Sequence, residues 1–252
     1  MAKPAYGDLA QIYDRIFGGY RAKVWEQARQ RWLGKVLPRV RSICDLGCGT
    51  GEAALAHARR GYKVLAVDLS PDMCRTVREK ARRAGLPVRV LQADMRSFRL
   101  REPVDLITAE YAVLNHARND GDLRRVMRAV ARALRPGGYF YSDITHRQGL
   151  KQVWTGTQWF DLPELFLAKS GGYDSKRGRG WIELVWFTYH RGAWNRCQDR
   201  IEAVAWSKAA VVRALRAAGF AGIETHDPAT LIRVAPLNRR GSKTFFLAQM
   251  PL

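Results

Sequence analysis

The sequence predicts an α/β fold, with seven mostly parallel strands in one sheet, helices on both of its faces and an antiparallel β insertion. Two observations predict it. Short apolar runs alternate with amphipathic stretches along residues 41–145, and the alternation returns after residue 206. Residues 147–206 follow a different pattern. Because parallel strands need crossover connections, the alternating helices are expected to cover both faces of the sheet.

Two helices are expected before the first strand. Apolar residues recur at helical spacing in residues 8–17, which predicts a short amphipathic helix that ends at Gly18. A second helix is expected at residues 20–37, stopping before Pro38. These segments lead into the first strand of the sheet.

The alternating part of the chain predicts seven strands and four helices. Ser70-Pro71 is a favourable cap and first-turn pair, and Gly219 follows the last helix as a C-terminal signal. The strands are expected at residues 41–46, 64–68, 88–93, 104–109, 139–144, 220–226 and 243–250. The helices are expected at residues 51–60, 71–84, 120–135 and 207–218.

The segment 147–206 is interpreted as an insertion between the fifth strand and its helix. It holds six of the eight tryptophans and a loop rich in Gly, Lys and Arg at 171–180. Two antiparallel strands are expected, at 181–190 and 194–206. The tryptophans are interpreted either as the core of this appendage or as an aromatic wall for a planar or cationic substrate, and the first reading is favoured.

Composition limits the classes of protein that need to be considered. The chain has 252 residues, enough for one large domain with an insertion, and no apolar run long enough for a signal peptide or membrane span. Its four cysteines lack disulfide-scaffold or zinc spacing, so reduced thiols in a cytoplasm and no metal are expected. The net charge of +20 fits an RNA partner or simply solvated helix faces, and the second reading is favoured.

A glycine-rich turn after the first strand is the strongest chemical signal. Gly47, Gly49 and Gly51 follow this strand and precede a helix, so a ligand can approach the backbone N–H groups closely. The third glycine of a dinucleotide-binding turn would fall at Glu52, which argues against a dinucleotide pyrophosphate site.

Acidic residues follow the next strands. Asp68 ends the second strand, where a carboxylate can accept hydrogen bonds from ribose hydroxyls. Asp94 and Met95 end the third strand and offer a partner for an exocyclic amine and an apolar wall for a base; Glu110 follows the fourth strand. Since carboxyl ends of parallel strands meet at one edge of a sheet, these residues predict a nucleoside site.

Together these motifs closely resemble class I S-adenosylmethionine-dependent methyltransferases, which have a Rossmann-like fold. The resemblance covers about residues 8–145 and resumes at 207–250. Within the class it points to the small-molecule branch (methyltransferase domain 25), including amino-sugar N-methyltransferases. The motifs are Asp45-Leu46-Gly47-Cys48-Gly49-Thr50-Gly51, Val67-Asp68-Leu69-Ser70, Gln92-Ala93-Asp94-Met95 and Leu134-Arg135-Pro136-Gly137-Gly138.

The resemblance implies S-adenosylmethionine as cofactor, S-adenosylhomocysteine as product, and transfer of the methyl group to a nitrogen or oxygen of a small metabolite. It also implies one methyltransferase domain over residues 1–252, with an N-terminal helical lid at 1–37 and a substrate-lid subdomain at 147–206. The residues expected at the cofactor are Tyr13, Asp45, Gly47, Cys48, Gly49, Asp68, Leu69, Asp94, Met95 and Glu110.

Methyl transfer from a sulfonium is an in-line displacement, and a base is needed only where the acceptor must lose a proton. His116 and His146 follow the fourth and fifth strands and are the candidate catalytic residues. The candidate substrate-binding residues are Tyr20, Arg21, Trp25, Tyr111 and Trp159.

An RNA methyltransferase is the alternative, disfavoured because the fourth strand is followed by Ala109-Glu110-Tyr111-Ala112 and by no lysine or cysteine typical of such enzymes. A non-catalytic cofactor-binding module and an oxidoreductase are the other readings considered. The acceptor and the oligomeric state remain open at this stage, and no membrane partner is expected.

Overall fold

The main sheet has seven strands in the order β10-β11-β5-β4-β1-β2-β3. The computed structural model describes residue 6 and residues 8–18, 20–227 and 241–252, without the side chains of residues 20–24. β11 runs antiparallel to both of its neighbours, and the other pairs are parallel, so the predicted fold class is confirmed. The strands are β1 (Ser42–Leu46), β2 (Lys63–Asp68), β3 (Val88–Gln92), β4 (Val104–Ala109), β5 (Leu134–Thr145), β10 (Ala221–His226) and β11 (Lys243–Gln249).

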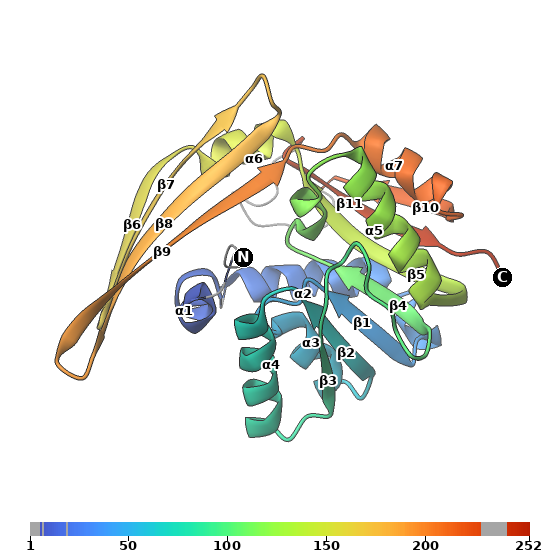
Figure 1. The fold of residues 1–252 in the computed structure, drawn as a ribbon. Coiled ribbons are helices and arrows are strands. Elements are labelled where there is room, and N and C mark those ends of the chain that lie inside the picture. Colours follow the sequence, from blue (N-terminus) through green and yellow to red (C-terminus); the bar gives the residue numbers. More distant parts are fainter. Residues whose placement is uncertain (1–5, 7, 19, 228–240) are drawn as a thin grey trace.

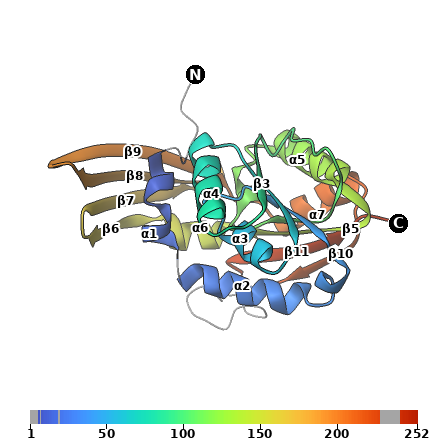
Figure 2. The same cartoon turned by 90° about the horizontal axis from the view of Figure 1, so that it is seen from below.

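Helices pack on both faces of this sheet. Ile43 and Leu106 lie in one apolar cluster with side chains of α2, whereas Cys44 and Ile107, the next residues in the same strands, lie in a second cluster with α5 and α7. Figure 2 shows α2 and α5 on opposite sides of the strands. The helices are η1 (Asp8–Gln11), α1 (Tyr13–Phe17), α2 (Tyr20–Leu33), η2 (Leu37–Arg39), α3 (Glu52–Arg59), α4 (Pro71–Arg83), η3 (Val113–His116), α5 (Asp120–Ala133), α6 (Arg147–Trp154) and α7 (Lys208–Ala217).

Most predicted bounds differ from the observed ones by a few residues, and two differences are larger. The expected helix at 8–17 is divided into η1 and α1. The fifth strand begins five residues early because Leu134 pairs with Val104, ahead of a register shift. Pro136-Gly137-Gly138, which separates the expected helix from the expected strand, therefore lies within β5.

The insertion is a second sheet, antiparallel, with the strand order β6-β7-β8-β9. It comprises β6 (Gly156–Leu162), β7 (Leu165–Asp174), β8 (Arg179–His190) and β9 (Ala193–Val204), preceded by α6. In Figure 1 it extends away from the main sheet, with α1 beside it. One of its faces packs on Leu9 and Ile12, which the N-terminal segment supplies. The antiparallel β insertion is confirmed.

Only β8 and β9 were expected from the sequence, and α6, β6 and β7 were not. Gly171 and Gly172 suggest a loop, yet both lie in β7. A Cβ at Gly171 would meet the backbone oxygens of Trp154 at 2.3 Å and Trp181 at 2.5 Å. Glycine stands there because helix and strand backbones approach on either side, as glycine in a strand interior often signals.

None of the helices in the described ranges is both long and apolar enough to cross a membrane.

Candidate functional site

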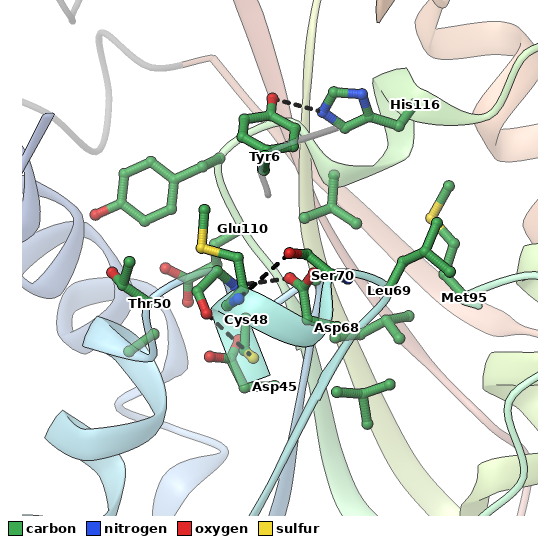
Figure 3. Close-up of a pocket in the computed structure, with 18 of the residues that line it drawn as sticks. Tyr6, Asp45, Cys48, Thr50, Asp68, Leu69, Ser70, Met95, Glu110 and His116 are labelled. Carbon is green, nitrogen blue, oxygen red and sulfur yellow. Dashed lines mark hydrogen bonds between the residues drawn. The ribbon is translucent and has the colours of Figure 1, made fainter. Parts of the chain in front are cut away.

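A cavity of about 480 Å³ lies where β1, β2 and β4 end, within the size range of about 300–1,000 Å³ for small-molecule sites. Figure 3 shows Tyr6 and His116 on one side of it and Asp45, Cys48 and Asp68 on the opposite side. All ten residues expected at the cofactor line this one cavity, from Tyr13 through Glu110. The lining also includes the following residues, which were not predicted: Tyr6, Phe17, Thr50, Glu52, Ser70, Arg96, Val113 and Arg118.

The glycine turn is shaped by close packing as much as by backbone conformation. Gly47 has φ +67°, and a Cβ there would lie 2.6 Å from a methyl group of Val113. Gly51 has φ +83°, and its Cβ would lie 2.8 Å from Val77. A side chain is therefore strained at both positions by conformation and by space. The turn brings backbone N–H groups to the start of α3, at the cavity wall.

Asp68 links the ends of β1 and β2. Its two carboxylate oxygens accept hydrogen bonds from the Gly49 N–H at 2.9 Å and the Ser70 N–H at 2.8 Å. Burial raises the pKa of this carboxyl, and the backbone hydrogen bonds oppose that rise. The carboxylate is thus held rigidly at the cavity wall, with its position fixed by backbone rather than by mobile side chains.

A buried ion pair stands behind the cavity. Arg29 of α2 donates to both carboxylate oxygens of Glu110, from Nε at 2.6 Å and from Nη2 at 2.9 Å. This bidentate geometry is the strongest that a guanidinium and a carboxylate adopt. Sequence reasoning missed Arg29; the available signal was a basic residue between Trp25 and Trp32 on the apolar face of a helix.

Asp45 lies close to this pair, and only one of its two carboxylate oxygens accepts a hydrogen bond from a described residue. It accepts a hydrogen bond from Thr108 Oγ1 at 3.1 Å, while its Oδ2 is buried with no hydrogen-bond partner among the described residues. Burial, together with the charge of Glu110, raises the pKa of Asp45 to about 7. An unpaired buried oxygen of this kind is costly unless a ligand supplies the missing donor.

Asp94, at the far end of the cavity, is paired with Arg96. The Arg96 Nε donates to both carboxylate oxygens, at 2.9 and 3.0 Å, and Nη2 donates to Oδ2 at 2.5 Å. These hydrogen bonds hold the pKa of Asp94 below its usual value. Asp94 is therefore fixed as an anion, and Met95 beside it lines the same cavity.

The turn after β4 has an unusual backbone. Tyr111 and Ala112 are consecutive non-glycine residues with positive φ, 64° and 65°. The Ala112 N–H donates to Asp143 at 3.1 Å, and the Lys243 ammonium pairs with the same carboxylate at 2.7 Å. Such strain persists where the surroundings hold it, and it is concentrated at functional sites. Here it turns the chain after Glu110, so that both Glu110 and Tyr111 line the cavity.

The N-terminal segment covers the cavity and is held at two points. Asp14 of α1 accepts hydrogen bonds from Thr50 Oγ1 at 2.6 Å and from the Lys80 ammonium. The Tyr6 N–H donates to Asp199 of β9 at 2.7 Å. The segment is therefore attached both to the glycine turn and to the second sheet.

The two candidate histidines lie in different surroundings. His116 lines the cavity, and its Nε2 lies 3.3 Å from the Tyr6 hydroxyl. Burial lowers the pKa of His116, although a backbone hydrogen bond at Glu202 opposes this. His146 does not line the cavity: its ring nitrogens lie 3.0 Å from the Trp206 carbonyl and 2.7 Å from Thr244 Oγ1. His146 joins neighbouring elements, and only His116 remains a candidate base.

Of the five candidate substrate-binding residues, Tyr111 lines the cavity. Trp25 does not: it is buried under the sheet, with its ring centroid 5.0 Å from that of Tyr111. Trp159 is mostly exposed on the second sheet and is also absent from the cavity lining. The side chains of Tyr20 and Arg21 lie outside the described residues.

Residues 43–138 match the model of a family described as a methyltransferase domain. This likeness to a methyltransferase domain covers the glycine turn and the strand ends that line the cavity.

Two curated proteins are similar to this chain over longer stretches than residues 43–138. The chain is 39% identical over 135 residues to a dTDP-4-amino-2,3,4,6-tetradeoxy-D-glucose N,N-dimethyltransferase of Saccharopolyspora spinosa, covering 52% of each chain. It is 32% identical over 155 residues to a tRNA 5-carboxymethoxyuridine methyltransferase of Escherichia coli K12, covering 58% of each. The first curated relatives are thus matched over 52–63% of their own length.

A solved structure shares the whole fold with this chain. The sugar N-methyltransferase KedS8 from Streptoalloteichus superposes with a TM-score of 0.76, covering 100% of this chain and 96% of that one, at 22% identity. The likeness in fold therefore covers both the main sheet and the second sheet.

The buried ion pair gives a prediction about stability. Replacing Arg29 with Met leaves Glu110 buried without its cation, so we expect a loss of about 3–5 kcal/mol in the free energy of unfolding. The double variant Arg29→Met, Glu110→Gln removes both charges and should lose markedly less. Urea denaturation of the two variants measures the difference; equal losses would show that the ion pair is not what the single substitution breaks.

Proposed function

We propose that this chain binds S-adenosylmethionine and transfers its methyl group to a nitrogen or oxygen of a small molecule. The observation that carries the proposal is that all ten residues expected at the cofactor line one cavity. The proposal includes an N-terminal lid at 1–37 and a substrate lid at 147–206 on the single domain 1–252. A cytoplasmic location is part of it, supported by four cysteines that are free thiols.

The residues of the cavity fit the proposed cofactor on chemical grounds. Asp68 offers carboxylate oxygens to a ribose diol, and Met95 offers an apolar surface to the base beside Asp94. The buried Oδ2 of Asp45 lacks a donor, which the ammonium of a methionine group would supply. Glu110 also lines the cavity, and its charge is balanced by Arg29, so it leaves no unpaired charge there.

When bound, S-adenosylmethionine supplies the electrophilic methyl group. The protein then has to align the acceptor behind that carbon and exclude water. Tyr6, Tyr13 and Phe17 lie over the cavity from the N-terminal segment and are suited to both tasks. Their rings also offer an apolar enclosure in which an uncharged amine is favoured over an ammonium ion.

The names of two similar proteins favour a nitrogen atom over an oxygen atom as the methyl acceptor. The Saccharopolyspora relative is a sugar N,N-dimethyltransferase, and the Streptoalloteichus structure is of a sugar N-methyltransferase. An amine is protonated near neutral pH and must lose that proton before its lone pair can attack. We propose that His116 accepts the proton, directly or through the Tyr6 hydroxyl, because its ring is held neutral in the cavity.

RNA methylation is the second candidate, and the Escherichia coli relative supports it. Many arginine side chains on α4 and α5 are exposed to solvent, and the net charge of the chain is +20. Within the described residues, however, the cavity lies under three aromatic rings of the N-terminal segment. That cover suits a compact acceptor better than a polynucleotide.

The proposed activity can be tested by incubating the full chain with S-adenosylmethionine and a panel of amino sugars, other small amines and hydroxyl compounds, with and without total RNA. We expect release of S-adenosylhomocysteine with members of the small-molecule panel. Release only in the presence of RNA would favour the second candidate, and no binding of S-adenosylmethionine by calorimetry would contradict both.

Asp68 provides a sharper test of the cofactor site. Replacing it with Ala removes the ribose partner and releases the Gly49 N–H, so affinity for S-adenosylmethionine should fall by about 10–100-fold, the range for hydrogen bonds to a charged group. Calorimetry measures the change. Asp72→Ala, an acid on α4 outside the cavity lining, serves as the matched control and should leave affinity unchanged.

The role of His116 predicts a pH dependence. A base must be neutral to act, and a pKa below the ordinary 6.5 keeps His116 neutral further into the acid range. The turnover number should therefore hold until the pH falls below about 6.5 and then decline. His116→Asn should lower turnover while leaving S-adenosylmethionine affinity intact, and Tyr6→Phe should have a smaller effect. Unchanged turnover and pH profile in His116→Asn would exclude the histidine as base.

A further inference from the structure

The face of the second sheet that points away from the main sheet is rich in aromatic side chains. Its residues alternate with those that pack inward on the N-terminal segment. We call this surface the outer face of the second sheet. It comprises Trp159, Asp161, Phe166, Ala168, Val185, Phe187, Tyr189, Trp194, Arg196 and Gln198.

Large apolar side chains on this outer face are open to solvent. The exposed fractions are 71% for Trp159, 55% for Trp194, 42% for Tyr189 and 36% for Phe166. These four are among only seven large hydrophobic residues exposed in the described ranges. Such concentration on one surface, rather than scatter, is typical of a protein interface, and exposed aromatic residues are its usual anchors.

One row of residues across the sheet carries opposite charges at its two ends. Asp161 on β6 pairs in register with Phe166 on β7, then Phe187 on β8, then Arg196 on β9. Asp161 and Arg196 are exposed on the two edge strands, and neither enters an ion pair with another described residue. Among the residues that the structure describes, this row thus offers one unpaired charge of each sign, with two phenylalanines between them.

This arrangement is self-complementary. A rotation of 180° about an axis parallel to the strands lays β6 of one copy over β9 of the other. In that orientation Asp161 of each copy meets Arg196 of the other copy, and Phe166 meets Phe187. Two sheets packed face to face keep their strands within about 30° of each other, which such a rotation allows. A two-fold interface requires a surface of this self-matching kind.

From this we propose that two copies of the chain associate through the outer face of the second sheet, with paired Asp161–Arg196 contacts flanking an aromatic centre. The partner is a second copy because the charges and rings of this row are complementary to the same row turned by 180°. The proposal is independent of the methyltransferase activity.

The test is sedimentation equilibrium of the full chain over a dilution series. We expect a monomer–dimer equilibrium that Phe187→Arg abolishes, since it places a charge at the centre of the interface. Asp161→Arg and Arg196→Asp each create like-charge contacts and should weaken the dimer by about 10-fold or more. The double variant exchanges the charges and should restore it. Arg128→Asp, an exposed charge reversal on α5, is the matched control.

Several outcomes would overturn the proposal. A chain that stays monomeric at every concentration has no such interface. A dimer that survives Phe187→Arg, in a variant whose circular dichroism shows it folded, uses another surface. A double charge exchange that fails to restore association, where the single variants weaken it, contradicts the two-fold pairing of Asp161 with Arg196.

Discussion

The buried pair between Arg29 and Glu110 is the interaction on which the site depends. It joins α2, which covers one face of the main sheet, to the end of β4, where the chain enters the cavity. Removing two charges from water is expensive, and only the bidentate geometry with full hydrogen bonding offsets that cost. The pair also sets the electrostatics of the cavity. Arg29 neutralises Glu110 and stabilises the charged form of Asp45, whose pKa burial has raised.

Around this pair, the cavity is assembled by contacts that cross between separate parts of the chain. Asp68 ties the glycine turn to the end of β2, and Asp143 holds the strained turn after Glu110. The N-terminal segment then joins the main sheet to the second sheet through Asp14 and Tyr6. Apart from the bond between Asp68 and Ser70, these contacts join residues that are distant in sequence, so the cavity requires the whole fold to be formed.

Much of this could be predicted from the sequence, for physical reasons. Apolar periodicity gave the parallel sheet, and acids at consecutive strand ends were brought together because parallel strands end at one edge. Arg29 was missed because its partner lies 81 residues away, and nothing in local sequence marks such a pairing. β7 was missed because Gly171 signals a turn unless two backbones crowd it. His116 and His146 occupy equivalent places after strands, and only their tertiary neighbours distinguish them.

The attachment of Asp14 to Thr50 and Lys80 has a kinetic consequence. Tyr6, Tyr13 and Phe17 lie over the cavity, and Asp14 anchors their segment directly to the glycine turn. On the proposed function, a nucleoside-sized molecule that passes on this side would require the segment to lift and these hydrogen bonds to break. Exchange of S-adenosylhomocysteine for S-adenosylmethionine would then depend on the opening of one short helix, a step that in many enzymes is slower than the chemical step.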